Sequence, residues 1–213
     1  MEKQNIVRNI FRDSLLKNSI YLMATSFVTS IIGFFFWIVA AKYYTPTDIG
    51  ITSAIFSGVS LISMIGSLGL SRALIFYLPR DKNTDKIISS CLAITIVSSI
   101  IFSMVFILGL KIWSPELMSI LNNIENILIF IVVTIAISIS GLIGAAFTAG
   151  RRSSFQMVKE TIYHFVKLCP LILFVRFRAM GILTSLGIGL LLSVIIGFFL
   201  LFKTWNYSPK LTL

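Results

Sequence analysis

Two cations inside otherwise apolar stretches are the residues whose type and position could do chemistry. Arg72 lies near the end of an apolar stretch at residues 49–78, and Lys167 lies within residues 157–175. An ionisable side chain at the bilayer centre costs about 2.5–3.5 kcal/mol on insertion scales, so each cation is a candidate for function. Guanidinium and ammonium groups both bind phosphate oxygens. We therefore predict a cationic cavity, open to the cytoplasm, whose apolar walls favour a lipid-like substrate with a phosphate or pyrophosphate head.

The alternative for both cations is snorkelling, in which the charged end reaches the lipid headgroups. Side chains lean toward the N-terminus of their own helix, so Lys167 would lean toward the cytoplasmic surface and Arg72 deeper into the membrane. A rise of about 1.5 Å per residue places Arg72 about 9 Å and Lys167 about 12 Å inside the cytoplasmic boundary. The direction of lean favours a substrate-facing role more for Arg72 than for Lys167.

His164 is the third substrate-binding candidate. His164 and Glu160 precede Lys167 by three and seven residues and share its helical face. Pro170 follows about one turn later and predicts a kink. A polar stripe beside a kink is typical of a helix that lines a hydrated cavity. The alternative, which stays open, is a packed histidine bonded to a neighbouring carbonyl.

Covalent catalysis has little to build on. The chain has one histidine, no pair of cysteines at metal-ligand spacing and no phosphate-binding glycine loop. All eight acidic residues are assigned to loops or to the edges of apolar stretches: Glu2, Asp13, Asp48, Asp81, Asp85, Glu116, Glu125 and Glu160. We therefore expect no catalytic residues, no metal site, no cofactor and no enzymatic activity.

Six apolar stretches are long enough to cross a bilayer, which takes about 20 residues for about 30 Å of hydrocarbon. They are residues 20–41, 49–78, 87–110, 127–149, 157–175 and 180–202. Twelve of the 18 basic residues, Lys159 among them, fall in the N-terminal arm, the second and fourth loops and the tail. Only four fall in the alternate loops: Lys42, Lys111, Arg176 and Arg178. We therefore predict an all-α integral protein of the cytoplasmic (plasma) membrane, with six transmembrane helices in one lobe. Because short basic loops stay cytoplasmic, both termini should lie inside.

The domain boundaries follow from these stretches. Residues 1–19 separate apolar from basic side chains and favour a cytoplasmic interfacial helix, with a disordered basic tail as the alternative. Residues 20–202 form the transmembrane lobe, and residues 203–213 form a cytoplasmic tail.

Composition excludes a soluble globular protein, since 57% of residues are hydrophobic, 12% are charged and the mean hydropathy is +0.97. The net charge of +10 is explained by the basic cytoplasmic loops, which also attract anionic membrane lipids. No basic cluster is interleaved with aromatic residues in a soluble segment, so we expect no nucleic-acid partner.

Local signals refine the helices. Thr45 predicts a helix cap, Pro46 suits the first helical position and Asp48 favours the positive end of the helix. Residues 114–116 (SPE) repeat this pattern and predict a short surface helix.

Glycines predict two further features. Gly66 and Gly69 indicate that the long second stretch kinks or tilts. Gly187, Gly189 and Ser193 recur at a spacing that close helix packing explains, and we assign them no chemistry.

Two motifs carry a family resemblance. The sequence AAKYYTPTDIG occupies residues 40–50, and GSLGLSRALIFYLPR occupies residues 66–80. Together they resemble the N-terminal region of polysaccharide flippases of the O-antigen transporter type, in the multidrug/oligosaccharidyl-lipid/polysaccharide exporter superfamily. The resemblance covers most of residues 14–205 and is most specific at residues 40–80.

The resemblance implies a transporter that flips a polyprenyl-pyrophosphate-linked oligosaccharide across the membrane for polysaccharide export, by alternating access between two helical lobes. Family members usually have twelve or more spans, so this chain resembles the N-terminal lobe. The implied partners are the lipid-linked oligosaccharide, membrane lipids, and a second six-helix lobe or another copy of the chain.

Two alternatives stay open. One is a lobe of a cation-coupled drug antiporter; such relatives often couple through a membrane carboxylate in this lobe, and the assignment of all acidic residues to loops or edges counts against it. The other is a non-transporting membrane subunit that scaffolds glycan-assembly enzymes.

Overall fold

The computed structural model describes residues 14–81 and 83–205, and within them the chain is helical, with no strand. The predicted interfacial helix at residues 1–19 falls largely outside the described residues, as does most of the predicted tail. The helices are α2 (Ser14–Tyr43), α3 (Pro46–Gly66), α4 (Leu70–Tyr77), α5 (Thr84–Trp113), α6 (Pro115–Ile120), α7 (Ile124–Ala149), α8 (Ser153–Val166), α9 (Leu168–Leu173) and α10 (Arg178–Trp205), with 3-10 turns η1 (Leu78–Arg80) and η2 (Val175–Phe177).

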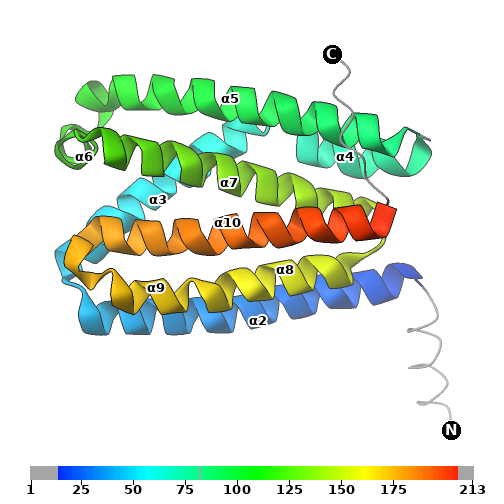
Figure 1. The fold of residues 1–213 in the computed structure, drawn as a ribbon, viewed down its shortest axis with the longest axis horizontal. Helices are drawn as coiled ribbons and strands as arrows, with labels where there is room; N and C mark the ends of the chain where they lie inside the picture. The colour runs from blue at the N-terminus through cyan, green and yellow to red at the C-terminus, as the bar shows by residue number, and fades with distance from the viewer. Residues whose placement is uncertain (1–13, 82, 206–213) are drawn as a thin grey trace, which may run out of the picture.

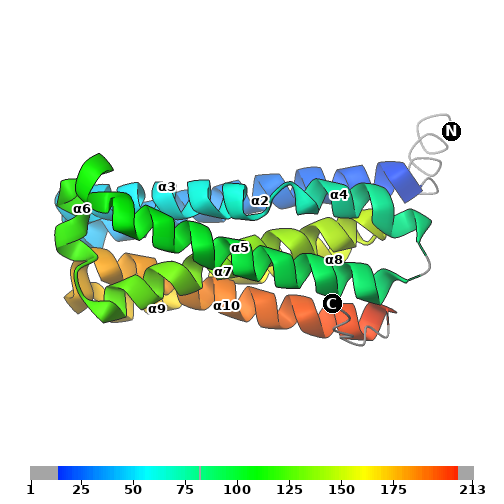
Figure 2. The ribbon, with the colours of Figure 1, turned by 90° about the horizontal axis from the view of Figure 1, so that it is seen from above.

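The helices lie side by side along one long axis (Figures 1 and 2). α10 packs between α7 and α8, α5 covers α7, and α2 packs along α8 (Figure 1). One end of the bundle holds the α2–α3 turn, α6 and the start of α10; the opposite end holds the start of α2 and the end of α10. The bundle therefore has two distinct ends joined by long helices.

Five helices in the described part are long and apolar enough to cross a membrane: Leu15–Tyr43, Pro46–Gly66, Thr84–Ile112, Ile124–Ala149 and Val175–Lys203. Their outer faces carry large exposed apolar side chains, among them Leu108 at 80% and Phe34 at 66% exposure. A continuous apolar surface of this kind is stable against hydrocarbon rather than water.

The helix start at Thr45 is confirmed. The Thr45 hydroxyl accepts the backbone N–H of Asp48 at 3.2 Å, and the Asp48 carboxylate accepts the backbone N–H of Thr45 at 3.3 Å, with Pro46 in the first turn. This reciprocal capping box satisfies two backbone donors that a helix start leaves unpaired. The short helix predicted after Ser114 is also confirmed, as α6.

The predicted kink in the second stretch is confirmed as a break between α3 and α4. Leu68 and Gly69 both adopt positive φ, 46° and 72°. The carbonyl of Gly66, which the break frees, accepts the buried hydroxyl of Ser98 on α5. A Cβ on Gly66 would lie 2.9 Å from the Ser99 hydroxyl, so the helices meet this closely only at glycine.

The fifth predicted stretch is not one helix but two, α8 and α9, which meet at Lys167. Pro170 explains the break, because proline has no N–H to donate and its ring clashes with the carbonyl four residues earlier. The Ser185 hydroxyl on α10 donates to the carbonyl of Lys167 at the break. The kink predicted from Pro170 is therefore present, and the helical segment begins at Ser153 rather than at residue 157.

The glycines of α10 permit close packing, as predicted. A Cβ on Gly187 would lie 2.9 Å from Val133 of α7, and one on Gly189 would lie 3.1 Å from Tyr163 of α8. Ser193 donates its hydroxyl to the carbonyl of Lys159 at 3.3 Å. α10 is therefore held tightly between α7 and α8.

Candidate functional site

α8 carries the main cluster of charged groups inside the bundle. Lys159 is fully buried, and its ammonium donates to the Ser140 carbonyl at 3.1 Å, to the Ser140 hydroxyl at 2.5 Å and to the Glu160 carboxylate at 2.7 Å. Ser140 belongs to α7, so the lysine ties α7 to α8. A buried ammonium is tolerated where hydrogen bonds and a counter-charge compensate its lost hydration.

This arrangement corrects two sequence predictions. Lys159 does not lie in a loop, and Glu160 does not lie at a helix end, because both belong to the interior of α8. Hydropathy did not reveal that these two residues lie inside the helix. Each charge lowers the mean hydropathy of the segment, although the two charges neutralise one another in the folded protein. The residue missed by sequence reasoning is Lys159, and its signal was the adjacent glutamate within an otherwise helical segment.

Lys167 lies at the α8–α9 break with only 5% of its surface exposed. Its ammonium lies 4.6 Å from the ring centre of Phe36 on α2 and 4.8 Å from that of Tyr163. Among the described residues, no hydrogen bond or ion pair reaches this ammonium. Lys167 lies 14 residues beyond Ser153, where α8 begins, and hence about 21 Å along the helix.

His164 lies close to Lys167, at the interface with α2. Its half-buried ring contacts Tyr163 at 4.7 Å between ring centres, and a Cβ on Gly33 of α2 would lie 3.9 Å from it. The His164 Nδ1 atom is buried and has no hydrogen-bond partner in the described part of the chain. His164 and Lys167 therefore both face α2, with nitrogen atoms left unsatisfied.

Arg72 is not brought together with these two residues. It lies on α4, which packs against α5 and α7, and its side chain is exposed. Its backbone N–H donates to the Gly69 carbonyl at 3.0 Å, but within residues 14–81 and 83–205 its guanidinium makes no hydrogen bond or ion pair. The structure therefore places a free guanidinium on one side of the lobe and the Lys167–His164 pair on another, at the α2–α8 interface.

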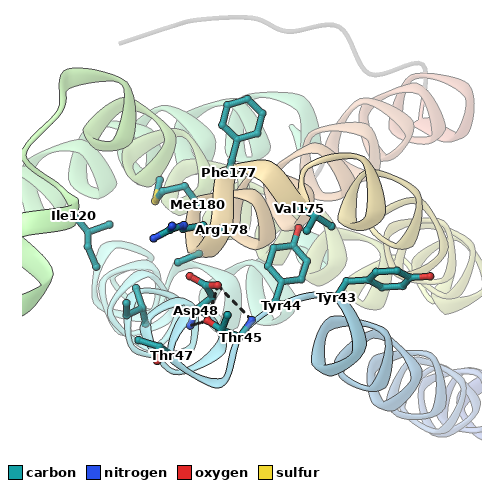
Figure 3. A pocket seen from close by; sticks show the side chains of 12 residues that line it. Tyr43, Tyr44, Thr45, Thr47, Asp48, Ile120, Val175, Phe177, Arg178 and Met180 are labelled. Carbon is teal, nitrogen blue, oxygen red and sulfur yellow. Dashed lines mark hydrogen bonds between the residues drawn. The ribbon is translucent and has the colours of Figure 1, made fainter.

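A cavity of about 720 Å³ lies at the end of the bundle where α2, α3, α6 and α10 meet. It is lined by residues 43–45, 47, 48 and 51, by Ile120, and by residues 175 and 177–180, and Arg178 and Asp48 both point into it (Figure 3). The phenol of Tyr44 donates to the Leu171 carbonyl at 2.7 Å. Burial, and secondarily the Asp48 carboxylate, raise the pKa of Tyr44 above its ordinary value. Sequence reasoning treated these residues only as a helix cap and a loop charge.

No group of three or more histidine, cysteine, aspartate or glutamate side chains that could hold a metal ion occurs among the described residues.

Long apolar helices that enclose buried cations define a multi-pass integral membrane protein. The model of the polysaccharide biosynthesis protein family matches residues 15–213, and the chain belongs to that family. No curated protein and no solved structure matches the chain. The resemblance found in the two motifs is thereby confirmed at the level of the family.

Proposed function

We propose that this chain is the N-terminal lobe of a flippase that moves polyprenyl-pyrophosphate-linked oligosaccharide across the cytoplasmic membrane for polysaccharide export. The observation that carries the proposal is the family match over residues 15–213 in a bundle with unsatisfied cations among its membrane helices. A pyrophosphate is an anion that such cations bind through charge-assisted hydrogen bonds. No covalent step is involved.

The proposed topology has six crossings, with both termini in the cytoplasm. Five are the continuous helices, and the sixth is the α8–α9 pair, whose 21 residues (Ser153–Leu173) span about 31 Å despite the break. Broken membrane helices are typical where the backbone lines a binding site in a transporter. The basic residues at the end of the bundle that holds the start of α2 support the orientation.

In this proposal Arg72, Lys167 and His164 bind the substrate. Arg72 is exposed and unpaired in the described part, so its planar donors are available to phosphate oxygens. Among the described residues, the Lys167 ammonium lies over aromatic rings and makes no hydrogen bond, and the His164 Nδ1 has no hydrogen-bond partner. Because these groups lie apart, we assign them to successive contacts along a path rather than to one simultaneous grip.

Alternating access requires a second body, so we propose that the lobe works against a second six-helix lobe or against another copy of the chain. A non-transporting scaffold subunit would need no such partner.

The drug-antiporter alternative regains one supporting observation, since Glu160 is a carboxylate inside α8. However, the Lys159 ammonium lies 2.7 Å from it and already supplies its counter-charge. A coupling cation is therefore not needed at Glu160. Drug efflux that depends on a cation gradient and disappears in Glu160→Gln would favour the antiporter instead.

The test is polysaccharide export by cells that carry the complete assembly with Arg72→Leu and Lys167→Leu together. The matched control removes the same charge from exposed residues near the bundle end, through Lys17→Leu and Lys86→Leu. We expect the first pair to abolish export and to trap lipid-linked oligosaccharide in the inner leaflet, and the control to export normally. Full export by the first pair would overturn the assignment of the site.

A further inference from the structure

The cavity at the α2–α3 turn combines opposite charges that do not neutralise each other. Asp48 and Arg178 both point into it, yet they form no ion pair (Figure 3). The Arg178 backbone N–H donates to the Val175 carbonyl, but its guanidinium makes no hydrogen bond among the described residues. The Asp48 atom Oδ2 accepts the Thr45 hydroxyl at 2.7 Å, and within the part of the chain that the structure describes no hydrogen bond reaches Oδ1. One cation and one anion are therefore free to bind a ligand.

The walls of this cavity are built rigidly. Thr52 of α3 donates its hydroxyl to the Ala179 carbonyl at 2.9 Å, which fixes the start of α10. A Cβ on Gly181 would lie 2.1 Å from the Phe174 carbonyl oxygen, so only glycine fits there. Together with the Tyr44 hydrogen bond, these contacts hold the two flanking turns in place before any ligand arrives.

Arg178 occupies a strained position. Its φ is 51° with ψ −135°, a conformation that side-chain-bearing residues rarely adopt and that glycine adopts freely. Strain of this kind persists where the surrounding structure imposes it, and it often marks a binding site. Here it accompanies a guanidinium directed into the cavity.

The cavity lies at one end of the membrane-length helices, where lipid headgroups are expected. It is formed where the crossings Leu15–Tyr43, Pro46–Gly66 and Val175–Lys203 end or begin. Ile120 and Met180 add apolar wall beside the two charges, as Figure 3 shows. A ligand that fits must carry a negative and a positive group at the membrane interface next to an apolar part.

We propose that this cavity binds the headgroup of a zwitterionic phospholipid with a primary amine, a phosphatidylethanolamine. Arg178 binds the phosphate oxygens through its fork of N–H donors. The Asp48 carboxylate accepts an N–H of the ammonium, which a quaternary choline lacks and a glycerol headgroup replaces with neutral hydroxyls. The apolar wall accommodates the beginning of the acyl chains. This site is independent of the proposed transport function.

The test is native mass spectrometry of the full chain released from nanodiscs that contain equal amounts of phosphatidylethanolamine, phosphatidylcholine and phosphatidylglycerol. The wild type should retain phosphatidylethanolamine about tenfold over the other two. Arg178→Gln should lose this retention, whereas Arg176→Gln, in the same turn but outside the cavity lining, should keep it. Asp48→Asn, whose amide oxygen can still accept the Thr45 backbone N–H, should retain phosphatidylethanolamine and phosphatidylcholine equally.

Arg178→Gly separates binding from folding. Glycine relieves the positive φ, so this variant should melt at a higher temperature than the wild type and still lose the lipid. Equal retention of the three lipids by the wild type, or unchanged preference in Arg178→Gln, would overturn the proposal. Displacement of the lipid by oligosaccharide released with mild acid from the host's own lipid-linked pool would assign the cavity to the glycan instead and would equally overturn it.

Discussion

The ammonium of Lys159 lies 2.7 Å from the carboxylate of Glu160, although the lysine side chain is fully buried and that of the glutamate is 26% exposed. The asymmetry means that the two residues do not depend on each other equally. Without Glu160, a buried cation would lose its counter-charge, whereas without Lys159 the carboxylate could still be reached by water.

We therefore predict that Glu160→Leu destabilises the protein by about 3 kcal/mol and that Lys159→Met changes its stability by no more than about 1 kcal/mol. Reversible unfolding in mixed micelles measures both. The opposite order of the two effects would show that the ion pair is held in another way.

The break between α3 and α4 gives a second prediction, through Gly69. Alanine at this position would adopt φ near 72° at a cost of about 1–2 kcal/mol, although open space surrounds it. Gly50→Ala, inside α3 and equally uncrowded, should stabilise by about 0.5–1 kcal/mol. Melting temperatures of the two variants should therefore move in opposite directions, and a shared direction would argue against the left-handed turn.

Tyr44 predicts an alkaline pH dependence. Burial and the Asp48 carboxylate raise its pKa in the folded protein above the ordinary value of 10.0, so its neutral form is favoured by folding. The stability that depends on neutral Tyr44 is present below pH 10 and falls as the pH rises through the folded-state pKa. Tyr44→Phe should lose about 1 kcal/mol at neutral pH, through the hydrogen bond to Leu171, and should lose less than the wild type on going to strongly alkaline pH. Tyr43→Phe, at an exposed ring, serves as the control and should follow the wild type.

Pro170 predicts a trade-off between stability and transport. Pro170→Ala restores an N–H that can bond within the helix, so we expect a gain of about 1–3 kcal/mol as α8 and α9 merge. The same change displaces Lys167 from the break, and export should fall about tenfold. Pro115→Ala at the start of α6, where proline is favourable, should leave export unchanged. Unchanged export by Pro170→Ala would remove the break from the mechanism.

Much of this architecture follows from the sequence. The helix start at Thr45 and the breaks near Gly69 and Pro170 were predictable because each depends on residues adjacent in the chain. The burial of Lys159 was not, since it depends on Ser140 of another helix. Helical rise predicted that Arg72 and Lys167 lie at similar depths. That the two side chains lie on different sides of the lobe follows only from the packing of α4 on α7 and of α8 on α2.

The cavity at the α2–α3 turn could not be predicted from the sequence for the same reason. Asp48 and Arg178 are 130 positions apart in the chain, and a loop charge has no signature that distinguishes a binding residue from a topology signal. The strained backbone of Arg178, which marks the position most clearly, is visible only in three dimensions.

Flippase activity is tested by measuring transbilayer movement of polyprenyl-pyrophosphate-linked oligosaccharide that is labelled on the sugar. The measurement uses proteoliposomes that contain the chain with its second lobe or with another copy. Access of an external sugar-cleaving enzyme to the label reports movement. If the protein is a flippase, the label should become fully cleavable with the wild-type assembly and remain about half protected with Arg72→Leu and Lys167→Leu, as in protein-free vesicles. A wild-type assembly that leaves the label as protected as protein-free vesicles do would contradict a flippase.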